Sequence, residues 1–216
     1  MQDNDPQSTR DLVIAAAIRL FGHQGYEATT VRQIALAAGG QNVALVSYYF
    51  GSKEGLRRAC AQEIVARIHR IFPTAPDEMP AAGQAAAERQ LETLLSLFLD
   101  FMTQVPEAED LAAFVLRELT ESGEVFDILY DGVIADRHRQ LCRLWGQATG
   151  TDPESETTRL TAFSMLGQVL YFRIGRPVVV RRLGWSGIAP AETEQIKKIL
   201  TTNLSAILAA YREDPE

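Results

Sequence analysis

The sequence contains few of the residues from which metal and redox sites are usually built. It has only two cysteines in 216 residues, Cys60 and Cys142, which form neither a CxxC pair nor a disulfide framework. The three histidines, His23, His69 and His138, are scattered, and none has a second ligand at metal-site spacing. We therefore expect no metal centre and no cofactor, and we expect each cysteine to be a small buried apolar residue.

Catalytic motifs are absent as well. The chain contains no nucleophile elbow, no HExxH and no phosphate-binding loop, because Gly51-Ser52-Lys53 lacks the upstream glycine. Glu118 and Glu121 lie three residues apart, a spacing that favours a solvated helix face over a catalytic carboxylate pair. A helical enzyme is therefore the disfavoured alternative, and we predict no catalytic residue.

Long apolar runs and a secretion signal are also lacking. No run of about 18 apolar residues is present. The first residues, MQDNDPQSTRD, have no apolar signal-peptide core. With 46% hydrophobic and 23% charged residues, the composition is that of an ordinary globular protein. We expect a cytoplasmic protein that makes no membrane contact.

Charge is distributed unevenly along the chain. The net charge is −7, but residues 1–72 contain eight Lys or Arg against six Asp or Glu, a net of +2. The remaining residues carry a net of −9. A slightly basic head on an acidic body permits contact between the head and nucleic acid.

The apolar pattern predicts an all-α fold. Apolar residues recur at three- and four-residue spacing, and no segment shows sustained strand alternation. Pro73, Pro76 and Pro80 predict a linker at 73–81, and we divide the chain into an N-terminal domain (1–52) and a helical ligand-binding and dimerisation domain (53–216). About nine helices are expected, at 9–22, 31–38, 42–50, 52–71, 83–104, 108–121, 124–148, 154–175 and 191–211, with 176–189 non-helical.

Residues 30–50 predict a helix-turn-helix. Ser8 or Thr9 is expected to cap the first helix, and Thr30 with Gln33 has the spacing of a capping box at the second. Ser52 is expected to cap the helix at 52–71. Gly39-Gly40 then makes a tight turn before the third helix. Two short helices joined by such a turn and packed on another form this motif.

The third helix is the candidate for contact with DNA. We expect Val43 or Ala44, with Val46 and Phe50, to anchor it. Asn42 is the best candidate for base contacts, because its amide can pair with adenine and it stands at the helix start. Hydroxyl and ammonium groups suit phosphate oxygens. The predicted DNA-binding residues are Thr30, Gln41, Asn42, Val43, Ala44, Ser47, Tyr48, Tyr49 and Lys53. From the pattern alone, a helical protein-interaction module that does not bind specific DNA remains the alternative.

Residues 9–58 resemble the DNA-binding region of TetR-family repressors. The resemblance is carried by AAAIRLFGHQGYEATT, by TVRQIALAAG and by YYFGSKEGL. It implies a homodimer that binds double-stranded operator DNA and has a ligand-responsive helical body. In one respect the chain departs from the family: Gly40-Gln41 separates Gly39 from Asn42, one residue more than usual, so that the turn is looser or the helix begins at Gln41.

Part of the body is similar to the CecR-type branch of that family. The similarity lies in GQVLYFRIGRP at 167–177, in RRLGW at 181–185 and in ELTESG at 118–123. Members of that branch are associated with efflux and drug-sensitivity genes, and their inducers are poorly defined.

The helices at 154–175 and 191–211 each carry two apolar stripes, which predicts burial on two sides. On the first helix, Leu160, Phe163, Gly167, Leu170 and Ile174 form one stripe. The predicted dimer-interface residues lie on the others and are Met165, Gln168, Phe172, Leu204, Leu208 and Tyr211.

A small-molecule effector is expected among the middle helices, where aromatic side chains gather. The predicted ligand-binding residues are Phe98, Phe101, Met102, Phe114, Arg117, Phe126, Tyr130 and Phe163, with Glu118 and His138 as further polar candidates. For each aromatic residue, an ordinary core role is the competing interpretation.

Overall fold

The computed structural model describes residues 6–72 and 83–213, and within these ranges every regular element is a helix. The predicted all-α fold class is therefore confirmed. The helices are α1 (Pro6–Gln24), α2 (Val31–Ala37), α3 (Val43–Phe50), α4 (Lys53–Ile71), α5 (Gln84–Gln104), α6 (Ala108–Glu118), α7 (Glu124–Leu129), the π-helical turn η1 (Tyr130–Ile134), α8 (Ala135–Thr149), α9 (Glu156–Ile174), α10 (Arg176–Leu183) and α11 (Pro190–Glu213).

The described residues fall into two compact units. Unit 1 contains residues 6–72 and 109–135, and unit 2 contains residues 83–108 and 136–213. Unit 1 thus extends beyond the predicted 1–52 domain, because α4, nearly all of α6, α7 and η1 belong to it. The predicted linker at 73–81 lies outside the described residues.

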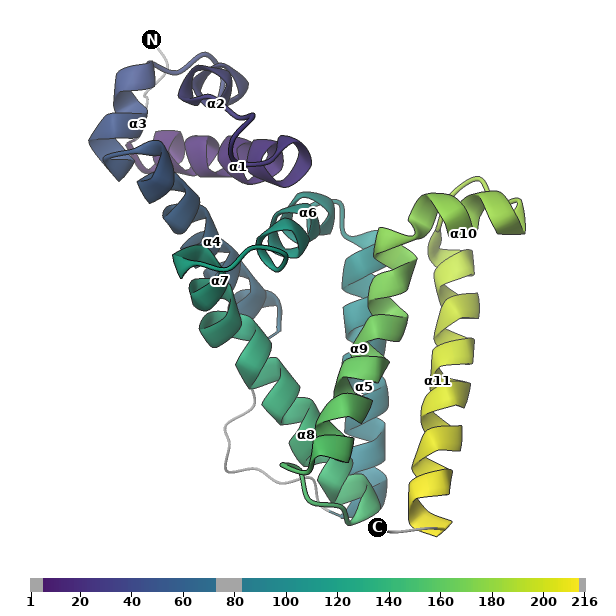
Figure 1. Cartoon of the computed structure of the whole chain (residues 1–216). Coiled ribbons are helices and arrows are strands. Elements are labelled where there is room, and N and C mark those ends of the chain that lie inside the picture. The colour runs from purple at the N-terminus through teal and green to yellow at the C-terminus, as the bar shows by residue number, and fades with distance from the viewer. Residues whose placement is uncertain (1–5, 73–82, 214–216) are drawn as a thin grey trace. The chain divides into compact units, whose positions relative to one another are not determined.

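Unit 1 is built around α1 and α4, which cross beneath α2 and α3 (Figure 1). The apolar stripe of α1 faces inward, with Val13, Ala17 and Phe21 buried. On α4, Leu56 and Ile64 are fully buried against it. The predicted cap at Ser8 or Thr9 is wrong, because α1 begins at Pro6 and contains both residues.

In unit 2, the long helices α5, α9 and α11 pack side by side (Figure 1). Their buried faces carry mostly leucine, methionine and valine side chains. Hydrogen bonds through hydroxyl groups also join these helices. Gln104 Nε2 donates to Thr193 Oγ1 at 2.6 Å, and Thr193 Oγ1 donates to Thr103 at 3.1 Å.

Two further predicted boundaries are wrong. Residues 176–183, predicted to be non-helical, form α10. Pro177 occupies its first turn and Gly184 ends it. The three β-branched residues Val178–Val180 are therefore helical. The segment 124–148 is interrupted by η1, where the carbonyl of Gly132 accepts a hydrogen bond from His69 Nε2 at 2.8 Å. Pro153 precedes α9, which is capped by Ser155.

Candidate nucleic-acid interface

The helix α2 begins with the predicted capping box. The hydroxyl of Thr30 accepts from the backbone N–H of Gln33 at 3.2 Å, and Gln33 Oε1 accepts from the backbone N–H of Thr30 at 2.7 Å. These bonds satisfy two of the free N–H groups of the first turn. They leave Thr30 exposed at the N-terminus of α2, where it is available to a ligand.

The turn after α2 accommodates the additional residue. Gly39 and Gly40 have φ angles of +93° and +77°, a conformation that favours glycine at both positions. The backbone N–H of Gln41 then returns to the carbonyl of Ala35 at 2.8 Å. The helix α3 therefore begins at Val43, with Asn42 as its N-cap, and not at Gln41.

The exposed face of α3 is formed by Val43, Ala44, Ser47 and Tyr48. The helix is held on its other face by Val46, which is buried. The prediction that Val43 or Ala44 anchors α3 is wrong, because both side chains are exposed, and Tyr48 is 80% exposed. Small apolar groups beside a serine and a tyrosine suit thymine methyls and phosphate oxygens.

Asn42 has a structural task at this surface. Its Oδ1 accepts a hydrogen bond from the backbone N–H of Ala44 at 2.9 Å. A bidentate contact with adenine uses the same oxygen, so that this atom would have to accept from the base as well as from the cap. Asn42 is exposed.

The candidate phosphate contacts lie around the start of α4. The ring of Tyr49 is partly buried and meets Tyr48 edge-on, with centroids 5.1 Å apart. Ser52 caps α4 as predicted, its hydroxyl accepting from the backbone N–H of Gly55 at 3.0 Å. Lys53 is the first residue of α4, and its Nζ lies 4.1 Å from the centroid of the Tyr26 ring.

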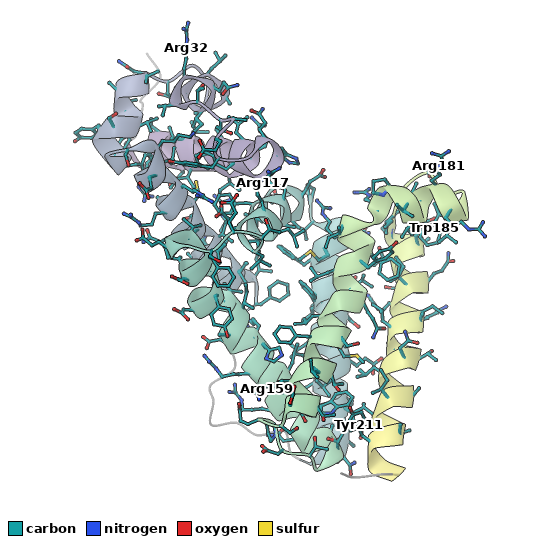
Figure 2. All side chains as sticks on the ribbon, viewed as in Figure 1. Arg32, Arg117, Arg159, Arg181, Trp185 and Tyr211 are labelled. Carbon is teal, nitrogen blue, oxygen red and sulfur yellow. The ribbon has the colours of Figure 1, made fainter. Side chains whose placement is uncertain are left out.

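One exposed cation was not among the predicted contacts. Arg32 extends from α2 into solvent in Figure 2. Its position in the TVRQIA run could have indicated it, because the second residue of a short helix beside the turn has few buried residues to pack against.

The other arginines of the head are largely occupied by carboxylates. Arg57 binds Glu118 through two nitrogens, at 2.8 and 2.6 Å, and also binds Glu121 at 2.6 Å. Arg58 binds Glu124 at 2.7 Å. The expectation that Glu118 lies on a solvated face is wrong, because only 3% of it is exposed.

These pairs change the interpretation of the charge pattern. Residues 109–135 bring seven Asp or Glu and one Arg into unit 1, which turns the +2 of the head into a negative total. A cavity of about 230 Å³ lies between α4 and the segment after α6, lined by Glu54, Arg57, Arg58, Glu118, Glu121, Ser122, Gly123, Glu124, Val125 and Phe126. The cations left for DNA are therefore those near α2 and α3.

Comparison with known proteins agrees with this geometry. The family model for the DNA-binding region of bacterial tetR regulatory proteins matches residues 13–60, and that for the C-terminal domain of the HTH-type transcriptional dual regulator CecR matches residues 87–211. CecR of Shigella flexneri is 32% identical over 94% of this chain and 92% of its own length. The chain belongs to the TetR family of transcriptional regulators, in its CecR-type branch.

Other similar proteins match a smaller part of the chain or match it at lower identity. The probable regulator YttP of Bacillus subtilis is 34% identical over 52% of this chain and 51% of its own length. A putative regulator from Pseudomonas aeruginosa shares the fold with a TM-score of 0.69 at 19% identity, covering 98% of this chain and 96% of its own. AibR, solved with isovaleryl coenzyme A and operator DNA, has a TM-score of 0.65 at 18% identity, covering 89% and 96%. YttP and the Pseudomonas protein are named as transcriptional regulators, and AibR was solved bound to operator DNA.

Within this TetR-family chain, the predicted dimer residues face inward. Met165, Leu204 and Leu208 are buried in the single chain and offer little surface to a second one. The other three, Gln168, Phe172 and Tyr211, are partly buried; Gln168 Oε1 accepts from Asn203 Nδ2 at 2.8 Å, and Tyr211 shares a 2.9 Å hydrogen bond with Thr161. The exposed apolar side chains of these helices are Leu160, Phe163, Tyr171 and Ile174 on α9 and Ile199 on α11.

The predicted ligand residues are divided between the units. Phe114, Arg117, Phe126 and Tyr130 lie in unit 1, whereas Phe98, Phe101, Met102 and Phe163 lie in unit 2. Two of them have structural roles instead. Phe114 is buried beside Phe21, and Arg117 donates to the carbonyl of Gly22 at 3.1 Å.

The other polar candidate, His138, is also occupied. His138 is buried, stacks on the ring of Phe163 and bonds the carbonyl of Arg159 at 3.0 Å.

Across the described residues, no group of three or more His, Cys, Asp or Glu is arranged to hold a metal ion. In the same part of the chain, no helix is both long and apolar enough to span a bilayer.

Proposed function

We propose that this regulator acts as a repressor, binding a palindromic operator as a homodimer and leaving it when a small molecule binds its body. The observation that carries the proposal is the exposed face of α3. Val43, Ala44, Ser47 and Tyr48 are exposed there, while Val46 on the opposite face is buried. Thr30, Arg32 and Lys53 flank this face and supply the phosphate contacts. Efflux or drug-sensitivity genes are the targets that we favour, from the CecR-type resemblance.

The dimer is assigned to the exposed apolar stripe of α9. Leu160, Phe163, Gly167, Tyr171 and Ile174 all lie on one side of that helix, and all are exposed in the single chain. An apolar stripe of this length on a soluble regulator marks a contact surface. A two-fold pair of chains would present two copies of α3 to the two halves of a palindrome.

Operator binding is tested by fluorescence anisotropy with labelled DNA from upstream of the coding region, at several salt concentrations. Wild-type protein is expected to bind tightly, with an affinity that falls steeply as salt rises. Tyr48→Ala should weaken binding, while Arg19→Ala, which removes an exposed cation from α1, is the matched control. No preference for the upstream DNA over random DNA, followed by no enrichment in a random-sequence selection, would reject the proposal.

Asn42 needs two variants, because its side chain caps α3. Asn42→Ser keeps an oxygen for the cap and removes the amide, whereas Asn42→Ala removes both. If Asn42 contacts bases, both variants lose sequence preference. If it only caps, Asn42→Ser binds like wild type.

Release requires that the effector favour one of two conformations of the protein. A coupling of about 1–3 kcal/mol would change operator affinity about 5–150-fold. The AibR structure contains isovaleryl coenzyme A, and another neighbour was solved with choline, so that compounds of both chemistries belong in the first effector screen. Because the CecR relative is named a dual regulator, a reporter assay should score activation as well as repression.

A further inference from the structure

Tyr26, in the turn between α1 and α2, lies between two cations of α4. The Nζ of Lys53 lies 4.1 Å from the ring centroid, and the Cζ of Arg57 lies 4.7 Å from it. Lys53 and Arg57 are four residues apart and therefore share one face of the helix. Burial raises the pKa of Tyr26, so that the phenol stays neutral and the cations meet an uncharged aromatic ring.

Arg57 is fixed from its other side. Both oxygens of Glu118 accept from it, and the 3% exposure of Glu118 leaves that carboxylate little room to move. Glu121 adds a third bond. A bidentate pair of this kind constrains the plane of the guanidinium as well as its position.

Lysine is the flexible member of this chain of contacts. Its four-carbon stem loses considerable rotamer freedom when the ammonium is held in one place. A contact that holds the ammonium before DNA arrives reduces this cost at the moment of binding. The ammonium of Lys53 lies over the ring of Tyr26, and the guanidinium of Arg57 lies over the same ring.

We propose that Glu118, Arg57 and Tyr26 form a positioning relay that holds the ammonium of Lys53 in place for an operator phosphate. Tyr26 supplies the surface, Arg57 keeps the ring in place, and Glu118 orients Arg57. None of the three needs to touch DNA. The proposal rests on the proposed function, because it takes the phosphate contact of Lys53 from there.

The test is a double-mutant cycle measured by anisotropy on the operator, across a range of salt concentrations. Lys53→Ala should weaken binding and lower the salt slope by about one, as expected for the loss of one phosphate contact. Tyr26→Leu should weaken binding about two- to fivefold, the size of one cation–π contact near the surface. In the Lys53→Ala background, Tyr26→Leu should have no further effect.

Two variants complete the design. Tyr26→Phe keeps the ring and should bind like wild type. Glu118→Gln removes the charge that orients Arg57 and should weaken binding in wild type but not in the Lys53→Ala background. Thermal unfolding of each variant establishes that the comparison is made well below its melting temperature.

The outcomes separate the relay from the proposed function. If Tyr26→Leu weakens binding equally with and without Lys53, its role is merely structural and the relay is wrong. If Tyr26→Leu has no effect while Lys53→Ala does, the relay is also wrong but the phosphate contact stands. If Lys53→Ala changes neither affinity nor salt slope while wild type binds the operator, the assigned phosphate contact itself fails.

Discussion

In unit 1, α4 is tied to α6 and the segment that follows by arginine–glutamate pairs, whereas in unit 2, α5, α9 and α11 pack mainly through apolar side chains. The Arg57–Glu118 pair of unit 1 is mostly buried, whereas the Lys197–Asp100 pair of unit 2, at 3.1 Å, is partly exposed. The difference follows the task of each unit. Directional ion pairs hold cations and aromatic rings in fixed places, while apolar packing leaves α9 with an exposed stripe for a second chain.

The largest effect should come from removing a buried charge. Glu118→Ala leaves Arg57, whose side chain is 17% exposed, without its main partner. Breaking such a pair is expected to lower the free energy of unfolding of unit 1 by about 3 kcal/mol. Hydrogen exchange in α4 and α6 measures this loss.

The matched variant in unit 2 is Asp100→Ala, which removes one partner of Lys197. Because the Asp100 side chain is 42% exposed, the expected loss is below about 1 kcal/mol. Both tryptophans, Trp145 and Trp185, lie in unit 2, so that their fluorescence follows its unfolding. Losses of equal size in the two variants would contradict the contrast drawn between the units.

A close contact between α1 and α6 should give the next largest effect. A Cβ on Gly22 would lie 2.8 Å from the backbone nitrogen of Phe114, so that Gly22→Ala must push the two helices apart. We expect a loss of about 1–3 kcal/mol, measured by urea unfolding followed by circular dichroism.

Gly167→Ala on α9 is the control for this substitution. No atom lies within 4 Å of a Cβ at Gly167, so that helix propensity alone should raise stability by up to about 1 kcal/mol. A loss at Gly167 would instead place another chain against the α9 stripe.

The last expected effect depends on pH and appears only under alkaline conditions. Burial raises the pKa of Cys60 in unit 1 and of Cys142 in unit 2, so that both folded units bind the thiol proton more tightly than the unfolded chain. Stability is therefore unaffected below the unfolded thiol pKa and falls as pH rises above it, by about 1.4 kcal/mol per pH unit for each thiol. Unfolding measured at several values between about pH 8 and about pH 10, a range that includes the unfolded thiol pKa, gives the slope of stability against pH.

Cysteine variants assign this slope to a unit. Cys60→Ala should flatten the alkaline loss in unit 1, seen by hydrogen exchange, and Cys142→Ala should flatten it in unit 2, seen by tryptophan fluorescence. Each substitution also changes stability by an amount that does not depend on pH, and comparing the slopes of stability against pH removes this contribution. An unchanged slope in both variants would show that other groups carry the alkaline dependence.

Local signals in the sequence were sufficient wherever neighbouring residues decide the structure. The capping box at Thr30 and Gln33, the cap at Ser52 and the Gly39-Gly40 turn all depend on residues within a few positions of one another, and all were predicted. The α10 segment was missed because its three consecutive valines resemble a strand or a loop. There, the proline in the first turn was the better guide.

The choice between two apolar stripes on α9 could not be made from the sequence. Met165 and Phe163 are both apolar and lie on the same helix, yet one is buried and the other is 52% exposed. Periodicity shows that two faces are apolar, but only the packing of α5 and α11 decides which of them one chain covers. For that reason, the predicted dimer residues include several on the face that one chain already covers.

The amino-acid sequence by itself determined the helical class, the helix-turn-helix and the family, because these depend on short-range capping, spacing and a nearly continuous motif. Only the tertiary structure brought Glu118 to Arg57, 61 positions apart, and Tyr26 to Lys53. Contacts between distant segments depend on how the helices pack, which no local pattern specifies. The head is therefore recognisable from its residues, but which of its cations remain free for DNA is decided by the helices packed against it.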